Sequence, residues 1–251
     1  MATLEELKQI VRENGELEGW HFSEVNIDYD PIPWDYAEIV RSYLKPNDRV
    51  LDIGTGGGEI FLSLAPNFAE GIGIDHYPEM VETAKTNQSR SGVSNVDFIE
   101  MDGSSLKFEK HEFDIVLLRH LHVYVNEIMR VLRPGGYFIT QMVGKGSSKN
   151  ILDAFGWTPG SFGPGWWQPV DELAKQFEDQ GCSVVAQGEY DVRCWFKDIP
   201  SFMFWIMSVP WPEDIQLEKH WHTINQIFKS STTDRGIETN EHRGLLLVRK
   251  L

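Results

Sequence analysis

Residues 54–58, Gly-Thr-Gly-Gly-Gly, are the part of this chain whose residue types and spacing most clearly predict chemistry. They follow an apolar, β-branched run at residues 50–53 that is typical of a buried strand, and residues 59–65 continue in a helical pattern. Glycines follow a tight turn easily and let a ligand approach the backbone closely. A strand, a glycine turn and a helix N-terminus together present free N–H groups and the positive end of a helix dipole. This arrangement predicts a nucleotide-binding turn.

Acidic residues near the turn narrow the class of ligand. In the dinucleotide fingerprint a third glycine packs the helix on the strand, but Glu59 takes that position here. Asp52 lies inside the strand, where a carboxylate would repel a pyrophosphate but suits a cationic ligand with an amino group. Asp75 follows the apolar strand 71–74, about 20 residues past the turn, where such folds place the carboxylate that binds ribose hydroxyls. His76 comes next, where a flat side chain could lie against an adenine.

The elements that would position these residues alternate between strands and helices, which is the signature of a parallel sheet. Further strands are predicted at residues 96–101, 113–118 and 137–143, and helices at 81–89 and before Pro134. Later in the chain we predict a loop at 144–165, a helix at 170–180, a strand at 183–187, two helix-like stretches near 202–207 and 215–228, and a final strand at 242–250.

One junction between these elements carries a family resemblance. A helix ends in Val131-Leu132-Arg133, and Pro134-Gly135-Gly136 would stop it and turn the chain back into the sheet. With the glycine turn and the acidic strand ends, this order of segments resembles class I S-adenosylmethionine (SAM)-dependent methyltransferases. The resemblance covers residues 34–143. Trp34-Asp35-Tyr36 and Arg119-His120 are similar to a bacterial, small-molecule-type subgroup.

The resemblance implies an α/β fold: a Rossmann-like sheet of seven mostly parallel strands, helices on both faces, and an α-helical cap inserted before the last strand. It also implies a single domain over residues 1–251. Its expected parts are an N-terminal helical lid at 1–45, a SAM-binding core at 46–195, a helical cap insertion at 196–240 and the last strand at 241–251.

The cofactor implied by the resemblance is SAM, whose amino-acid part the glycine turn would cradle. Asp102 and Gly103 would contact the edge of the adenine. The expected cofactor-binding residues are Asp52, Gly54, Thr55, Gly56, Asp75, His76, Asp102, Gly103, Arg119 and His120.

Candidate catalytic residues follow the strand 113–118, because ligands of open α/β sheets bind beyond the carboxyl ends of the strands. We predict His120 and His122 there, with His120 facing the transferred methyl group as a base or as a contact. A base is needed only if the attacking atom carries a proton at neutral pH. A histidine here could instead simply cap the strand. The His-x-His pairs at 120 and 220 lack accompanying cysteines or carboxylates, so no metal site is predicted.

Aromatic residues are frequent after residue 156, and they predict an apolar or planar substrate site. The predicted substrate-binding residues are Tyr36, Trp166, Trp167, Trp205 and Trp211. Aromatic side chains at helical spacing also fill cores, and a homodimer interface would bury them equally well.

Composition limits the classes of partner. The 251 residues carry a net charge of −15, which argues against nucleic acid, since that affinity depends on Lys and Arg. Cys182 and Cys194 are too few for a disulfide framework, no apolar run is long enough for a membrane span, and the N-terminal residues lack an apolar signal core. We therefore expect a cytoplasmic protein.

The sequence thus predicts an enzyme, a SAM-dependent methyltransferase that acts on a small organic molecule by in-line displacement. The alternatives are a methyltransferase of RNA or protein, a catalytically silent SAM-fold binding subunit, and an NAD-dependent enzyme. Glu59 disfavours the last of these, and the intact Asp52, Gly54, Gly56 and Asp75 argue against a silent protein.

Overall fold

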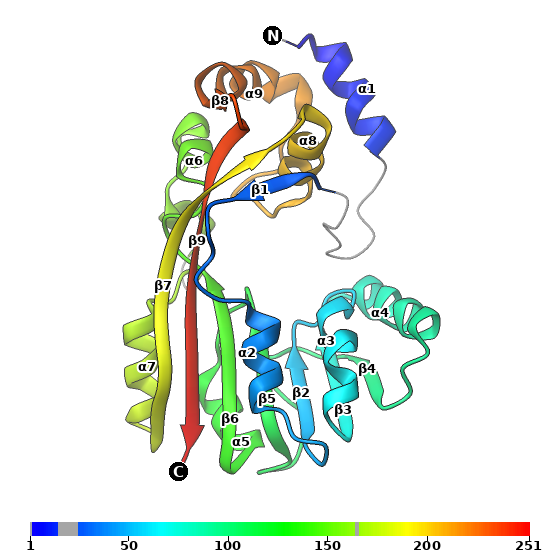
Figure 1. The fold of residues 1–251 in the computed structure, drawn as a ribbon, viewed down its shortest axis with the longest axis vertical. Coiled ribbons are helices and arrows are strands. Elements are labelled where there is room, and N and C mark those ends of the chain that lie inside the picture. The colour runs from blue at the N-terminus through cyan, green and yellow to red at the C-terminus, as the bar shows by residue number, and fades with distance from the viewer. Residues whose placement is uncertain (1, 15–24, 164–165) are drawn as a thin grey trace.

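A mixed sheet of nine strands runs through the molecule (Figure 1). The computed structural model describes residues 2–14, 25–163 and 166–251. Five neighbouring strands are parallel, in the order β6-β5-β2-β3-β4. They are β2 (Arg49–Ile53), β3 (Glu70–Asp75), β4 (Val96–Glu100), β5 (Phe113–Arg119) and β6 (Leu132–Val143).

The other part of the sheet is antiparallel and continues from β6 in the order β9-β7-β1, with β8 on the far end of β9. These strands are β1 (Ile27–Tyr29), β7 (Cys182–Phe196), β8 (Thr232–Thr233) and β9 (Gly236–Lys250). The predicted fold class is confirmed, but the predicted count of seven strands is too low. The two extra strands, β1 and β8, have three and two residues, too few to show a period in the sequence.

Helices cover both faces of the parallel part. On one face α2 (Tyr36–Tyr43), α3 (Glu59–Leu64) and α4 (Pro78–Ser91) bury a cluster that includes Val40, Phe61 and Leu245. On the other face α5 (Val125–Val131) and α7 (Val170–Glu178) bury a second cluster that includes Ile128 and Phe177. Pro134 and the two glycines after it lie at the beginning of β6, which starts directly after α5.

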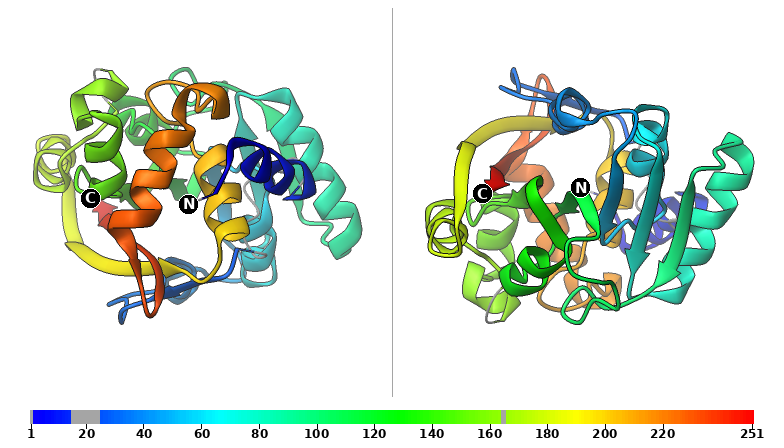
Figure 2. Two further views of the ribbon diagram at one scale, coloured as in Figure 1. Left: turned by 90° about the horizontal axis from the view of Figure 1, so that it is seen from above. Right: turned by 90° about the horizontal axis from the view of Figure 1, so that it is seen from below.

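A third cluster lies beyond the carboxyl ends of the parallel strands, toward which β2 points in Figure 1. We call this part the cap: α1 (Leu4–Asn14), α6 (Lys149–Phe155), α8 (Ile199–Ser208) and α9 (Leu217–Ser231). Viewed from above, α9, α8 and α1 lie side by side (Figure 2). Phe196 and Ile237, at the ends of β7 and β9, pack into the same cluster.

The cap differs in two respects from the predictions for its segments. The predicted loop at 144–165 contains α6 and a short 3-10 helix, Pro159–Phe162, because Ile151 and Leu152 are buried in the protein. The predicted N-terminal lid is divided, since α1 packs on α8 and α9 whereas α2 packs against α3 and β6. Within the predicted lid at 1–45, residues 1 and 15–24 lie outside the described residues.

The pair β7–β9 joins the parallel sheet to the cap (Figure 1). The two strands are paired from Cys182↔Lys250 to Phe196↔Ile237. Both are much longer than the predicted strands at 183–187 and 242–250. Their extensions are rich in charged and polar residues, which form strands here because each has a partner strand and one face packs on protein.

Candidate functional site

The predicted cofactor-binding residues lie at or near the carboxyl ends of neighbouring strands, on the edge that faces the cap (Figure 1). Along this edge the order is Asp75 at the end of β3, the glycine turn after β2, Arg119 and His120 at the end of β5, and Gln141 near the end of β6. Crevices outside the carboxyl ends of strands are where open α/β sheets bind ligands. The structure thus gathers residues from four strands on one edge.

The glycine turn is held to the sheet by backbone hydrogen bonds. The N–H groups of Gly54 and Thr55 donate to the carbonyl oxygen of Ile74, at 2.8 and 2.9 Å. Gly54, Gly56 and Gly58 all have positive φ angles, and Gly58 precedes the first turn of α3. The Leu121 side chain occupies the position that a Cβ at Gly54 would take. Sequence reasoning missed this contact, since Leu121 is an ordinary apolar residue far away in the chain.

Gly58 also performs the packing role that sequence reasoning associated with position 59. A Cβ at Gly58 would stand 2.7 Å from Cζ of Phe98, which is buried on β4. Asn87 of α4 supports the same turn by donating from Nδ2 to the carbonyl oxygen of Gly57, at 2.9 Å. An asparagine inside a helix gives no signal of such a role in the sequence.

The structure predicts that Gly58→Ala destabilises the protein by about 2–4 kcal/mol, because left-handed backbone strain is added to overpacking against Phe98. Gly92→Ala is the matched control, since Gly92 has a similar φ of 73° with nothing within 4 Å of its added Cβ. Urea unfolding of both variants measures the difference. Equal losses of stability would contradict the close packing of Gly58 and Phe98.

Asp75 is a buried carboxylate with backbone partners, and its side chain is oriented by the glycine turn. Its Oδ2 accepts from the N–H of Gly56 and its Oδ1 from the N–H of Tyr77, both at 3.0 Å. Each carboxylate oxygen has two lone pairs, so both can still accept a hydroxyl. His76 lies beside it, with Nδ1 3.9 Å from Oδ1 of Asp75, and is about half exposed.

Asp102 and Gly103 follow β4 on the same edge. Asp102 is exposed, and its Oδ1 accepts from the N–H of Ser104 at 2.7 Å. Hydrogen bonds from Ser104 lower the pKa of the Asp102 carboxyl, and His76 contributes in the same direction. Asp102 is therefore an ionised acceptor close to His76. The predicted adenine contacts are thus near each other.

Asp52 and Arg119 form a second charged group on this edge. Burial raises the pKa of Asp52 to about 6, and the hydroxyl of Thr55 and the positive charge of Arg119 oppose that shift. The guanidinium of Arg119 lies over the ring of Tyr36, 5.9 Å from its centre. Tyr36 itself is buried, and its hydroxyl donates to the carbonyl oxygen of Ile139 at 3.3 Å. The predicted substrate contact at Tyr36 therefore lies within the core, where it supports Arg119.

His120 has the local geometry of a constrained residue. Its φ of 61° is in the left-handed region, and its N–H donates to the carbonyl oxygen of Gln141 at 2.9 Å. Its Nε2 is buried without a hydrogen-bond partner. Burial, together with the charges of Arg243 and Arg119, lowers the pKa of His120 well below its usual value. The imidazole is neutral at pH 7, with a nitrogen that can interact with a ligand.

His122 lies further along the same loop, where its ring contacts that of Tyr124, with centroids 4.7 Å apart. Among residues 2–14, 25–163 and 166–251, no three His, Cys, Asp or Glu side chains come together as metal ligands would.

The predicted substrate tryptophans fall into two groups. Trp205 and Trp211 belong to the cap cluster, with ring centroids 5.5 Å apart, and Nε1 of Trp211 donates to the carbonyl oxygen of Ile206. Trp166 is 44% exposed, and Trp167 carries the Nζ of Lys145 over its ring. The neighbouring Gln168 bonds the backbone of Val123, which places Trp166 and Trp167 beside the loop after β5. This second group lies beside the loop that carries His120 and His122.

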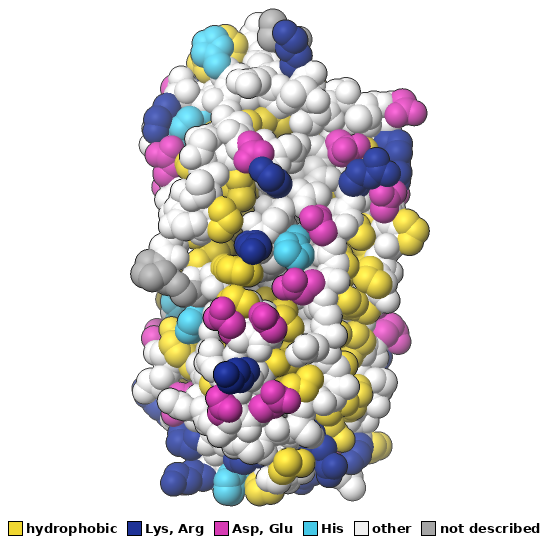
Figure 3. Space-filling model, turned by 90° about the vertical axis from the view of Figure 1, so that its left-hand side faces the viewer, with side chains coloured by type: hydrophobic (Ala, Val, Ile, Leu, Met, Phe, Trp, Pro, Cys, Tyr) yellow, Lys and Arg dark blue, Asp and Glu magenta, His cyan; other side chains and the backbone are white. Residues whose placement is uncertain are grey.

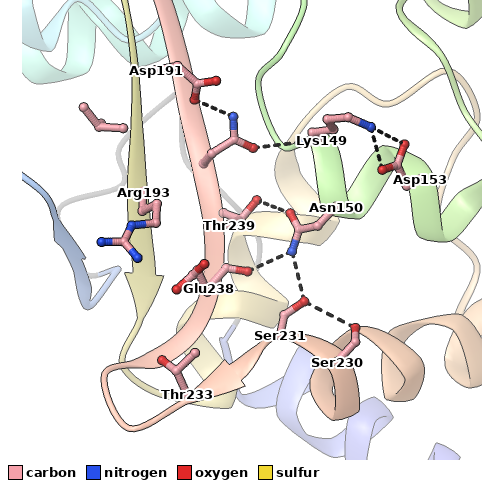
Figure 4. A pocket seen from close by; sticks show the side chains of 12 residues that line it. Lys149, Asn150, Asp153, Asp191, Arg193, Ser230, Ser231, Thr233, Glu238 and Thr239 are labelled. Carbon is pink, nitrogen blue, oxygen red and sulfur yellow. Dashed lines mark hydrogen bonds and ion pairs between the residues drawn. The ribbon is translucent and has the colours of Figure 1, made fainter.

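A separate hollow of about 590 Å³ lies between α6, the end of α9 and the β7–β9 pair (Figure 4). Its polar side chains bond one another: Asn150 donates to Ser231 and accepts from Thr239, and Lys149 pairs with Asp153. Arg193 pairs with Asp30. These mutual bonds favour a structural role in fixing α6 to β9.

The face formed by α6 and α7 shows acidic and basic side chains interspersed, and this face has no continuous basic surface (Figure 3). Within the part of the chain that the structure describes, no helix has the length and apolarity needed to cross a bilayer.

Comparison with known sequences matches residues 51–140 to the family described as "Methyltransferase domain". The uncharacterized methyltransferase YcgJ of Bacillus subtilis is 39% identical over 108 residues, which are 40% of this chain and 43% of that protein. The 23S rRNA (uracil(1939)-C(5))-methyltransferase RlmD of Klebsiella pneumoniae is 42% identical over 79 residues, 30% of this chain and 18% of RlmD. The ubiquinone/menaquinone biosynthesis C-methyltransferase UbiE of Ectopseudomonas mendocina is 30% identical over 114 residues, 41% of this chain and 44% of UbiE. The chain thus spans less than half the length of these relatives.

Solved structures extend the likeness of fold over most of the chain. A putative methyltransferase from Bacillus halodurans superposes with a TM-score of 0.64 at 20% identity, covering 86% of this chain and 98% of that one. A SAM-dependent methyltransferase from Thiobacillus denitrificans, in complex with S-adenosyl-L-homocysteine, gives a TM-score of 0.56 at 19% identity. The superposition covers 89% of this chain and 94% of that one. The predicted resemblance to class I methyltransferases is confirmed.

Proposed function

We propose that the protein transfers a methyl group from SAM to a small organic acceptor, because residues 51–140 match the family described as "Methyltransferase domain". The observation that carries the proposal is the glycine turn bonded to Asp75, a buried carboxylate at the carboxyl end of the neighbouring strand. Relatives named as methyltransferases of small molecules support the acceptor class.

The residues at this edge fit the cofactor. Each oxygen of the buried Asp75 carboxylate accepts one backbone N–H and keeps a lone pair that can accept a ribose hydroxyl. Asp75 would hold the ribose hydroxyls, Asp102 and His76 the adenine, and Asp52 the amino group. Leu121 lies against Gly54, so the loop after β5 would move for a ligand to contact the turn.

Bound SAM supplies an electrophilic methyl group on a positively charged sulfur. The residues of the chain bind and orient the two reactants and exclude water, which suffices for much of the acceleration of an in-line displacement. His120 is neutral and lies next to Arg119, so we place its unpartnered Nε2 on the acceptor side of the methyl group. His122, Trp166 and Trp167 would border the entrance.

RNA is the second candidate acceptor, because RlmD is among the relatives that the chain matches in part. The net charge of −15 opposes it, since RNA affinity rests on cationic side chains. A small molecule is therefore the better-supported acceptor.

Calorimetric titration with S-adenosylhomocysteine, SAM and NAD tests the cofactor. We expect both SAM ligands to bind and NAD not to bind. Turnover of methyl-labelled SAM with small phenols, acids and amines, and with total RNA, tests the acceptor. Labelling of RNA alone would favour the second candidate, and absence of binding by either SAM ligand would refute the proposal.

Asp52→Asn is expected to raise stability at neutral pH by about 1–3 kcal/mol and to weaken binding of S-adenosylhomocysteine. The folded-state pKa of about 6 lies above the ordinary 3.8, so the folded state binds the proton more tightly than the unfolded chain. The carboxylate therefore destabilises the fold progressively as pH rises from about 4 to about 6, and fully above that range. Urea unfolding at about pH 4.5 and pH 7.5 should show a gap between variant and wild type that grows with pH. An equal gap at both pH values would contradict this account.

A further inference from the structure

Tyr190, Glu241 and Arg243 form a hydrogen-bonded cluster on the β7–β9 pair. The hydroxyl of Tyr190 donates to Oε1 of Glu241 at 2.6 Å, and a guanidinium nitrogen of Arg243 donates to Oε2 at 2.8 Å. The side chains of Arg243 and Glu241 are 16% and 19% exposed, so the ion pair is mostly but not fully withdrawn from water. The cluster thus keeps a carboxylate oriented at a partly accessible position.

The strand register places this polar cluster between the apolar cluster under α2 and the apolar cluster of the cap. Alternate residues of a strand share a face, and so do paired residues of neighbouring strands. Ile237, Glu241, Arg243 and Leu245 therefore lie on one face of β9, with Tyr190 paired to Arg243. Leu245 packs in the cluster of α2, and Ile237 packs in the cap. The polar cluster lies in the intervening stretch, between the sheet core and the cap.

Contacts connect this stretch to the proposed methyl-transfer site. Trp34 packs edge-on against Tyr190, with ring centroids 4.7 Å apart, and donates from Nε1 to Oε1 of Gln141 at 3.0 Å. The carbonyl oxygen of Gln141 accepts from the N–H of His120. The charge of Arg243 contributes to the low pKa of His120. The cluster is thus the next group along the sheet edge after His120, on the side away from the glycine turn.

Other ionisable groups facing Glu241 are uncharged at neutral pH. Tyr29 of β1 is paired with Cys194 on the same face, and burial raises the pKa of both groups, with a further contribution from Glu241. Burial also raises the pKa of Tyr190, and Glu241 adds to this shift. Arg243 is therefore the cation that balances the negative charge of Glu241. A further group that donates a proton to Glu241 would donate it to a carboxylate.

On the basis of the proposed function, we propose that Tyr190 and Glu241 bind an aromatic acceptor by its hydroxyl group and take up the proton that the methyl group replaces. The acceptor O–H would donate to Oη of Tyr190, with its ring beside Trp34. As the acceptor oxygen bonds to the methyl carbon and the methyl–sulfur bond breaks, the acceptor proton passes to Tyr190 and that of Tyr190 passes to Glu241. The products are a methyl ether, neutral S-adenosylhomocysteine and a protonated Glu241, which then loses its proton to water.

The test uses 4-nitrophenol, whose phenolate form absorbs visible light, with protein saturated with S-adenosylhomocysteine. A carboxylate beside the bound phenol disfavours its ionisation. The pH titration of bound 4-nitrophenol should therefore shift down by about one pH unit or more in Glu241→Gln relative to wild type. Tyr190→Phe, which keeps the ring, should weaken 4-nitrophenol binding by about tenfold. With methyl-labelled SAM, Glu241→Gln should lower kcat by about 10²–10⁴-fold, with a smaller change in KM.

Glu189→Gln is the matched control, because Glu189 neighbours Tyr190 on β7 but lies on the opposite face, beside His242. Its titration curve should coincide with that of wild type. Absence of 4-nitrophenol binding to loaded wild type, or equal titrations in Glu241→Gln and Glu189→Gln, would overturn the inference. Binding of S-adenosylhomocysteine to wild type and to each variant distinguishes the two failures. If wild type binds that ligand but the 4-nitrophenol results are contrary, the inference fails and the proposed use of SAM stands.

Discussion

Asp75→Ala is expected to weaken binding of S-adenosylhomocysteine by about 10- to 100-fold, which corresponds to about 1.4–2.7 kcal/mol. The variant loses the charged acceptor proposed for the ribose hydroxyls. It also removes the acceptor for the N–H groups of Gly56 and Tyr77, so the glycine turn keeps only its backbone bonds from Gly54 and Thr55 to Ile74 of β3. Calorimetry measures the affinity, and circular dichroism establishes that the variant is folded.

Two further variants sharpen this test. Asp75→Asn retains one acceptor oxygen without the charge and should fall between alanine and wild type. Asp97→Asn removes an exposed carboxylate from the adjacent strand and should bind S-adenosylhomocysteine as wild type does. Unchanged affinity in folded Asp75→Ala would exclude Asp75 from the cofactor site.

Phe202→Ala should destabilise the cap by about 3–5 kcal/mol, because its ring is fully buried and the substitution leaves a cavity. Phe202 packs against Phe196, Trp205 and Phe228, and so joins α8, α9 and the end of β7. The proposed cofactor residues lie on other elements, so affinity for S-adenosylhomocysteine should change by less than about threefold. We expect the cap to unfold in a separate, early transition, and tryptophan fluorescence measures it.

Phe162→Ala is the control for this variant. Phe162 is only half-buried and stacks on the exposed Trp166, so the loss should stay below about 1 kcal/mol. If Phe202→Ala abolishes binding of S-adenosylhomocysteine in protein whose sheet remains folded, the cap and the cofactor edge are coupled more closely than their separate clusters suggest.

The cofactor side of the site was predictable because its determinants are local. Gly54, Gly56 and Asp75 lie within 22 consecutive residues, and their strand–turn–helix context has a recognisable period. The alternation of strands and helices then placed Arg119 and His120 on the same edge. What the sequence could not reveal was that Gly58, and not position 59, packs against Phe98, since that contact depends on a distant strand.

The acceptor side was not predictable, because its determinants are separated in sequence. Tyr190 and Glu241 are brought together only by the register of β7 and β9, and polar residues on long strands show no clear period. Tryptophan frequency pointed to Trp205 and Trp211, which pack within the cap. Trp34 was noted only as part of the family resemblance, yet its ring contacts Tyr190. Residue type alone does not distinguish an aromatic core from a pocket wall.

The position of β9 has a consequence for how the protein is made. This strand lies between β6 and β7, although residues 236–250 are synthesised after both of them. Until these residues emerge, β6 lacks its antiparallel neighbour and β7 has only the three-residue β1 to pair with. Long, unpaired strand edges favour association between chains. Ribosome-bound chains that end before residue 236 should therefore depend on chaperones, and completion of β9 should commit both the sheet and the cap to their native arrangement.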